Sequence, residues 1–205
     1  MDNLSASDIV MPSAELVQVR LVEAIAVKKR MAYNGIAESA VEVAKLMVTC
    51  LRSGGTVIFL GNGGSAQDAG HLAAELMGRL AFDRPGLAAI SLPDATATMT
   101  AIGNDYSYDD VFARQITAIG HSGDVVIGLT TSGNSVNVVR AFEAAAYGGM
   151  TTVALTGRHG RKAAASAQIA IQIPSNDTPR IQEACLHLGH TICEMVEAAL
   201  FPKPS

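Results

Sequence analysis

The sequence predicts an α/β protein: a doubly wound, five-stranded parallel sheet flanked by helices and preceded by a helical hairpin. Two observations support this. Five short, apolar, β-branched runs alternate with helical patterns about every 25 residues along the chain. Such spacing favours right-handed crossovers, which place strands parallel and helices on both faces of the sheet. With 205 residues, 49% of them apolar, we expect one domain over 1–205.

Two helices are predicted ahead of the first strand. One runs from Ser13 to about Tyr33, and the next from Gly35 or Ile36 to Arg52, where glycines end it. We expect residues 1–53 to form a hairpin used in oligomerisation, because its apolar faces need a partner such as another copy. The polar residues 1–12 are expected to fray. Residues 54–205 are expected to form the α/β core and the C-terminal helix.

The elements of the core follow in order. Strands are expected at 56–60, 87–92, 124–129, 151–156 and 168–173. Helices are expected at 66–80, 94–102, 108–119 and 136–147, with a short one within 157–167 and a long one from Pro179, capped by Thr178, to about Leu200. The polar residues 103–106 interrupt the helical pattern.

A glycine turn follows the first strand. Its residues are Gly61, Asn62, Gly63, Gly64 and Ser65, and we expect Ser65 to cap the helix behind it. A strand, a glycine turn and a helix N-terminus together form a site for phosphate or another anion. The spacing is neither that of a dinucleotide fingerprint nor that of a Walker loop. A purely structural turn explains this stretch equally well.

A second turn of the same kind follows the third strand. Thr130, Thr131, Ser132 and Ser135 place four hydroxyls in six residues at the start of a helix. Hydroxyls and free N–H groups at a helix start suit a phosphate monoester. Capping serines alone would need fewer hydroxyls, so we favour a phosphate site. Both turns lie at carboxyl ends of strands, where ligands of such sheets bind, so they can converge on one crevice.

Titratable residues stand on two of the predicted helices. His71 and Glu75 are four apart and share one face, as a general base or a metal pair would. On the last helix, the 100° turn per residue allows two clusters. One is Gln182 with His190, and the other is Glu183 with His187 and His190.

Composition excludes several classes of function. A net charge of −4 without a basic stripe argues against a nucleic-acid partner. No apolar run approaches the ~20 residues that span a bilayer, and no signal-peptide pattern opens the chain. Three cysteines without a C-x-x-C motif indicate reduced, buried thiols. We therefore expect a cytoplasmic protein.

Four separated motifs resemble the phosphoheptose isomerases, enzymes with a SIS domain. They are GNGGSAQDAGHLAAE, TAIGNDYSYDDVFARQ, TTSGNS and TPRIQEACLHLGH, in that order. The resemblance covers nearly the whole chain. It implies a homotetramer with active sites between subunits, which converts sedoheptulose 7-phosphate to D-glycero-D-manno-heptose 7-phosphate. That reaction is the first step towards the activated heptose of bacterial surface polysaccharide, including lipopolysaccharide.

The resemblance also assigns roles to residues. It implies substrate contacts at Asn62, Gly63, Gly64, Ser65, Glu75, Asn104, Asp105, Thr130, Thr131, Ser132, Ser135 and Gln182. It implies a site for Zn²⁺, present in some members, at His71, Glu75, Gln182 and His190, and thereby selects Gln182 over the Glu183 cluster. A ketose–aldose isomerisation needs a base near the carbon and an acid near the oxygens, and we assign Glu75 and His190 to these roles.

Two other classes of protein share this layout. One is a non-catalytic SIS-domain protein that binds the bacterial replication initiator, which the apolar ending at 199–202 resembles somewhat. That relative would lack Glu75 and His190, and both are present here. The other is a sugar-phosphate-sensing regulator, which normally carries a helix-turn-helix domain, and we expect no room for one in this chain.

Overall fold

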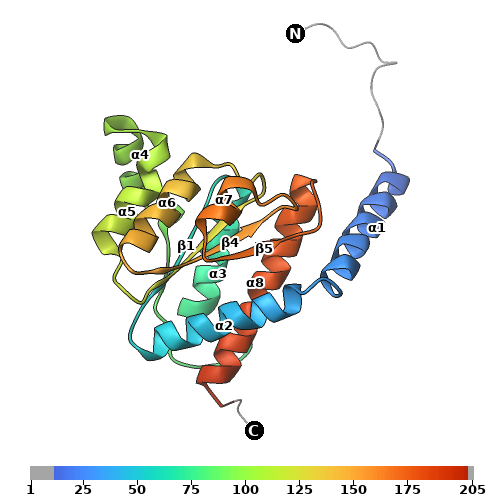
Figure 1. The fold of residues 1–205 in the computed structure, drawn as a ribbon. Helices are drawn as coiled ribbons and strands as arrows, with labels where there is room; N and C mark the ends of the chain where they lie inside the picture. The colour runs from blue at the N-terminus through green and yellow to red at the C-terminus, as the bar shows by residue number, and fades with distance from the viewer. Residues whose placement is uncertain (1–11, 203–205) are drawn as a thin grey trace, which may run out of the picture.

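The computed structural model describes residues 12–202, so most of the N-terminal segment expected to fray lies outside it. Within it, five parallel strands form one sheet in the order β2-β1-β3-β4-β5 (Figure 1). The strands are β1 (Val57–Gly61), β2 (Ala89–Ser91), β3 (Val125–Thr130), β4 (Thr151–Thr156) and β5 (Ile169–Gln172). The predicted parallel sheet is confirmed, with β2 and β5 shorter than expected.

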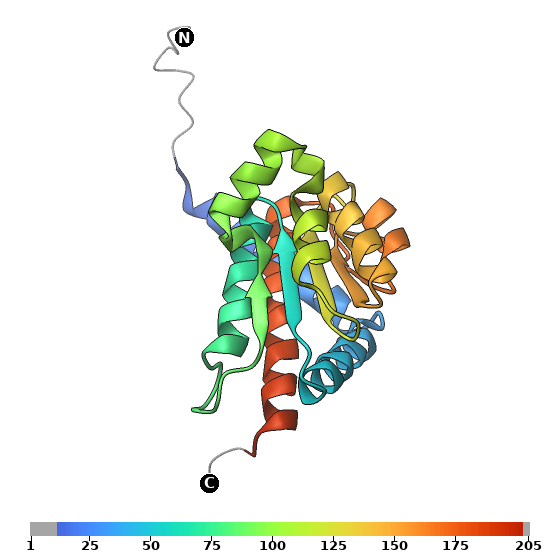
Figure 2. The ribbon, with the colours of Figure 1, turned by 90° about the vertical axis from the view of Figure 1, so that its left-hand side faces the viewer.

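Helices cover both faces of the sheet, as a doubly wound fold requires. One face carries α1 (Ala14–Met31), α2 (Ile36–Arg52), α3 (Gly64–Met77) and α8 (Thr178–Leu200). The other carries α4 (Thr96–Asp105), α5 (Val111–Ile119), α6 (Val136–Tyr147) and α7 (Arg161–Ser166), with short 3₁₀ turns η2 (Leu92–Asp94) and η3 (Tyr108–Asp110). Figures 1 and 2 show this division.

Alternate residues of each strand enter two separate cores. Val57 and Phe59 of β1 pack under α2, α3 and α8, whereas Ile58 and Leu60 pack under α5 and α6. Strands buried on both faces explain why the sequence shows continuous apolar runs and no alternation. The carboxyl ends of β1 and β3 are neighbours in the sheet, so the turns that follow them open at the same edge.

Three local expectations were wrong. Helix α3 begins at Gly64 and not after a Ser65 cap, because Gly63 adopts a φ of 57° that favours glycine and serves as the N-cap. Residues 103–105 do not break the chain's helical path but form the last turn of α4. Helix α8 is capped by Asp177, so Thr178 is its first residue.

Helices α1 and α2 follow each other in the sequence but differ in the elements they pack against. Helix α2 packs on α8 and on the sheet, and α1 makes its main contacts with α8. Apolar side chains on α1 remain exposed, and Val17 and Val22 keep 59% and 65% of their surface. In residues 12–202, no helix is both long and apolar enough to cross a bilayer.

Candidate active site

The two ligand-binding turns predicted from the sequence meet in the structure. Asn62 after β1 and Asn137 at the start of α6 exchange two amide hydrogen bonds, each 2.9 Å long. The hydroxyl of Tyr108 donates a further bond of 3.0 Å to Asn62 Oδ1. The two turns therefore lie next to each other, and a reciprocal amide pair holds them together.

The glycine turn exposes part of its backbone. Gly63 and Gly64 are exposed, whereas Ser65 is buried in the first turn of α3, where its N–H donates to Asn62 O. The amide of Gln182 lies directly over Gly64, at the place where a Cβ would stand. A side chain there would displace the amide of Gln182 from the helix start.

The hydroxyl turn carries hydrogen bonds among its own residues. Thr130 Oγ1 and Ser135 Oγ share a hydrogen bond of 3.0 Å, and Ser132 Oγ accepts from the N–H of Asn134 at 3.2 Å. A cavity of about 480 Å³ opens beside this turn. Its walls include Thr131, Ser132, Asn134, Arg158, His159 and Arg161. Among residues 12–202 no carboxylate lines it and two arginines do, so its electrostatic environment favours an anion.

A second group of polar side chains forms where α3 and α8 face each other. His71 and Glu75 come from α3, and His190 comes from α8, 119 residues after His71. The two imidazole Nε2 atoms are 2.8 Å apart, with the rings edge to face. Glu75 Oε1 lies 3.1 Å from His71 Nε2 and 3.9 Å from His190 Nε2. His71 Nε2, His190 Nε2 and Glu75 Oε1 thus face a common point between α3 and α8.

These three residues could hold a metal ion, because their ligand atoms all lie within 4.8 Å of one another. Two imidazoles and one carboxylate are a common ligand set of catalytic zinc sites, which leave a position open for substrate. The fourth ligand implied by the resemblance, Gln182, lies at Gly64, and within residues 12–202 no hydrogen bond joins it to the other three.

The alternative cluster on α8 does not form. Glu183 binds Arg180 at 2.6 Å and is 46% exposed. His187 is also exposed and lines an apolar groove against α1 and α2. Burial lowers the pKa of His187 below its ordinary value, and the positive charge of Lys28 and proximity to His190 add to the effect. Of the residues in this cluster, His190 alone faces Glu75.

Asn104 and Asp105 stand apart from both groups. They lie exposed at the end of α4, and the Asn104 amide donates to Asp105 Oδ1 at 2.9 Å. Within the described part of this single chain, the structure does not bring them to Glu75 or His190.

Sequence reasoning missed two residues of this region. Asn137 shows no signal beyond its place behind a hydroxyl turn. Asp68 had one, because it lies three residues before His71 and seven before Glu75, on the same helix face. Within residues 12–202 its Oδ2 is buried without a hydrogen-bond partner, and Asp68 lines an open pocket with His71. Burial raises the pKa of Asp68, and His71 partly offsets the rise.

Comparisons with known proteins agree with this geometry. Residues 23–157 match the SIS domain family. A phosphoheptose isomerase of Sulfurimonas denitrificans is 51% identical over 78% of this chain and 82% of its own, and one of Thermodesulfovibrio yellowstonii is 48% identical over 80% and 82%.

Solved structures show the same relation. A phosphoheptose isomerase from Neisseria gonorrhoeae superposes with a TM-score of 0.84 at 41% identity, over 90% of this chain and 98% of that one. Another from Francisella tularensis gives 0.87 at 34% identity, over 92% and 100%. The chain belongs to the phosphoheptose isomerase family of SIS-domain proteins.

Proposed function

We propose that this protein interconverts sedoheptulose 7-phosphate and D-glycero-D-manno-heptose 7-phosphate, the first step of activated heptose biosynthesis. The observation that supports the proposal is that Glu75 Oε1 and His190 Nε2 lie 3.9 Å apart, although their helices are far apart in the sequence. The relatives named phosphoheptose isomerase support the same reaction.

The phosphate end of the substrate lies, in this proposal, between the two turns. Hydroxyls of Ser65, Thr130, Thr131, Ser132 and Ser135 and the N–H groups of Gly63 and Gly64 are the donors available there. Helix α6 starts at the hydroxyl turn and α3 at the glycine turn, so two helix N-termini face the anion. Asn62 and Gln182 contact the sugar chain between the phosphate and the reacting carbons.

The reaction moves hydrogen between neighbouring atoms without loss or gain. Glu75 takes a proton from C1 of the ketose as the C2 carbonyl oxygen accepts one, which gives an enediol. The proton returns to C2 while the hydroxyl at C1 loses its own, which gives the aldose. His190 exchanges protons with the two oxygens. Its Nε2 is 2.8 Å from His71 Nε2, so His71 orients it.

We also propose Zn²⁺ as the metal of the His71, Glu75 and His190 site, with Gln182 as the further ligand that the resemblance implies. Bound there, zinc would polarise the carbonyl and stabilise the negative charge of the enediolate. The two imidazoles and the carboxylate are the ligand types that zinc accepts.

The quaternary structure completes the proposal. Leu16, Val17, Val22 and Ile25 expose 52–65% of their surfaces around α1, an apolar area that further copies of the chain would cover. We propose a homotetramer in which residues 1–53 form the interface and Asn104 and Asp105 reach substrate at a subunit boundary. Light scattering at the monomer mass would contradict it. Sugar-phosphate chemistry and three free cysteines fit the cytoplasm.

The alternative, a non-catalytic protein that binds the replication initiator, explains less. Such a protein has no use for a base and an imidazole held in contact. The test is a discontinuous assay of sedoheptulose 7-phosphate with purified protein, with and without Zn²⁺. We expect aldose product, and no turnover in either condition would favour the binding protein.

A further inference from the structure

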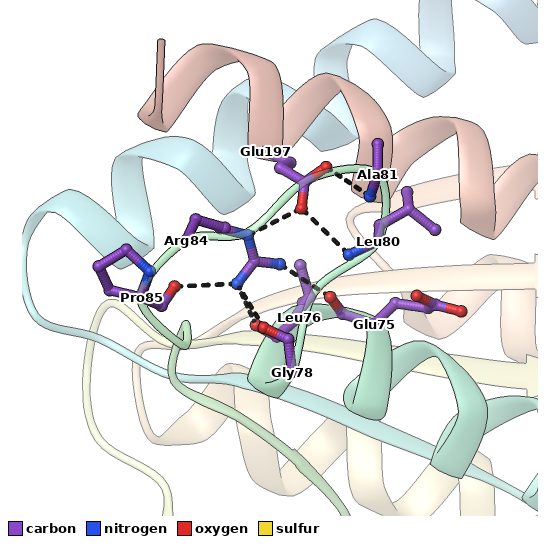
Figure 3. A network of polar contacts seen from close by, with 8 residues as sticks. All are labelled: Glu75, Leu76, Gly78, Leu80, Ala81, Arg84, Pro85 and Glu197. Carbon is purple, nitrogen blue, oxygen red and sulfur yellow. Dashed lines mark hydrogen bonds and ion pairs between the residues drawn. The ribbon is translucent and has the colours of Figure 1, made fainter. Parts of the chain in front are cut away.

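A buried ion pair lies at the far end of the interface between α3 and α8 (Figure 3). Arg84 Nε donates to Glu197 Oε1 at 2.9 Å, and each side chain is only 1% exposed. The two oxygens of Glu197 also accept from the N–H groups of Leu80 and Ala81, at 3.0 and 2.9 Å. Burial alone would raise the pKa of Glu197, but these donors outweigh it and hold the pKa below its ordinary value.

The guanidinium of Arg84 also caps the C-terminal end of α3. Its two Nη atoms donate to four backbone carbonyls, those of Glu75 at 2.8 Å, Leu76 at 2.8 Å, Gly78 at 3.2 Å and Pro85 at 3.0 Å. A cation is favoured at this end of a helix, where carbonyls lack partners. One of the bonded carbonyls belongs to Glu75 itself, so Arg84 holds the backbone of the proposed base.

Glu197 stands in register with the proposed acid. It follows His190 by seven residues, which is two helical turns and about 10 Å along α8, on nearly the same side. Near His190, α3 and α8 touch closely, because a Cβ on Gly189 would collide with Leu72. The two helices are therefore joined at two places, beside the reacting groups and at the Arg84–Glu197 pair.

The distance between Glu75 and His190 depends on how the Arg84–Glu197 pair holds α3 against α8. They come from different helices, and His71 bridges them, because its Nε2 lies 3.1 Å from Glu75 Oε1 and 2.8 Å from His190 Nε2. If the C-terminal turn of α3 shifts on α8 by about 1 Å, the base moves relative to the acid, and such misplacement costs rate. The glycine turn lies at the opposite end of α3 and the hydroxyl turn lies at the start of α6, so both would keep their positions.

We propose that Arg84 and Glu197 are positioning residues of the isomerase: they lock the end of α3 onto α8 and thereby set Glu75 against His190. The proposal rests on the isomerase function above. Neither residue touches substrate. Their effect must therefore appear in kcat and not in KM, which separates positioning from a general loss of structure.

The experiment measures kcat, KM and thermal unfolding for three variants and the wild type. Glu197→Gln keeps the size of the side chain but replaces one acceptor oxygen with a donor. Arg84→Lys keeps the charge but loses the fork that reaches several carbonyls. The matched control is Asp124→Asn, because Asp124 is also a buried carboxylate, and it accepts from the N–H groups of Thr56 and His121 at 2.8 Å. It stands before β3, at the sheet edge opposite the site.

We expect Glu197→Gln to lower kcat at least tenfold with KM within twofold of wild type, and Arg84→Lys to lower kcat by a smaller factor. Asp124→Asn should lower the unfolding temperature but leave kcat unchanged. Rates are expressed per mole of folded protein. If Glu197→Gln folds poorly, the kcat of Arg84→Lys decides the outcome. A kcat within twofold of wild type in both variants, or an equal change in the control, overturns the proposal. An inactive wild type would instead refute the proposed function.

Discussion

The sharpest prediction concerns Glu75→Gln, which removes the carboxylate that serves as the proposed base and as one of the proposed zinc ligands. Glutamine matches glutamate in shape, and the Glu75 carbonyl that binds Arg84 is unchanged. Only the carboxylate facing His71 and His190 is replaced. Because the glycine turn lies at the other end of α3 and the hydroxyl turn at the start of α6, substrate should still bind, with KM within about threefold of wild type.

The magnitude follows from the work assigned to the carboxylate. General base catalysis by one positioned side chain contributes typically 10²–10⁴-fold. At 1.36 kcal/mol per factor of ten, that loss corresponds to about 2.7–5.4 kcal/mol of transition-state stabilisation. The amide cannot take the C1 proton, so kcat should fall by at least about a hundredfold.

The assay follows aldose formation from sedoheptulose 7-phosphate at saturating substrate. Glu183→Gln is the matched control, because this glutamate lies on α8 in the alternative cluster but binds Arg180 and is 46% exposed. It should keep wild-type kcat and KM. A Glu75→Gln enzyme within tenfold of wild type would show that another group is the base, and a large loss in Glu183→Gln would revive the alternative cluster.

Three further predictions address the structure around the site. Asn137→Ala removes both bonds to Asn62, so KM for the sugar phosphate should rise about tenfold with kcat little changed; an unchanged KM would refute the role of the amide pair. The pKa of Glu197 is lowered from its ordinary 4.5, so the unfolded state binds more protons in acid, and stability should fall as pH drops below about 4.5. Chemical denaturation of Glu197→Gln should show a shallower acid dependence, by up to about 1.4 kcal/mol per pH unit, and equal slopes would contradict the shift. Burial raises the pKa of Cys185 and of Cys193 to about 12, so a thiol reagent at pH 8 should label neither in the native protein and both after unfolding, as mass spectrometry would detect.

Much of the fold is legible in the sequence because its signals are local. Continuous β-branched runs indicate strands buried on both faces, and α2, α6 and β4 begin and end where the pattern predicts. Helix α3 begins earlier than expected because the conformational freedom of Gly63 outweighs the capping preference of Ser65. Asn104 and Asp105 likewise belong to the last turn of α4, where the polar residues predicted a break.

The candidate site, too, could be predicted from the sequence only in part. The pairing of His71 with Glu75 follows from helical spacing, but their meeting with His190 depends on how α3 packs on α8. The spacing on α8 allowed two clusters, and the ion pair between Glu183 and Arg180 rules out the one that contains Glu183. The Arg84–Glu197 pair has no sequence signal, because its members lie 113 residues apart and resemble ordinary surface charges.

The most direct test of the central claim is proton NMR of sedoheptulose 7-phosphate in deuterated water with the purified protein. If Glu75 and His190 act together through an enediol, the aldose C1 proton signal appears and solvent deuterium enters C2, since Glu75 is 18% exposed and can exchange its proton. A ketose spectrum that stays unchanged, with and without Zn²⁺, would contradict the account.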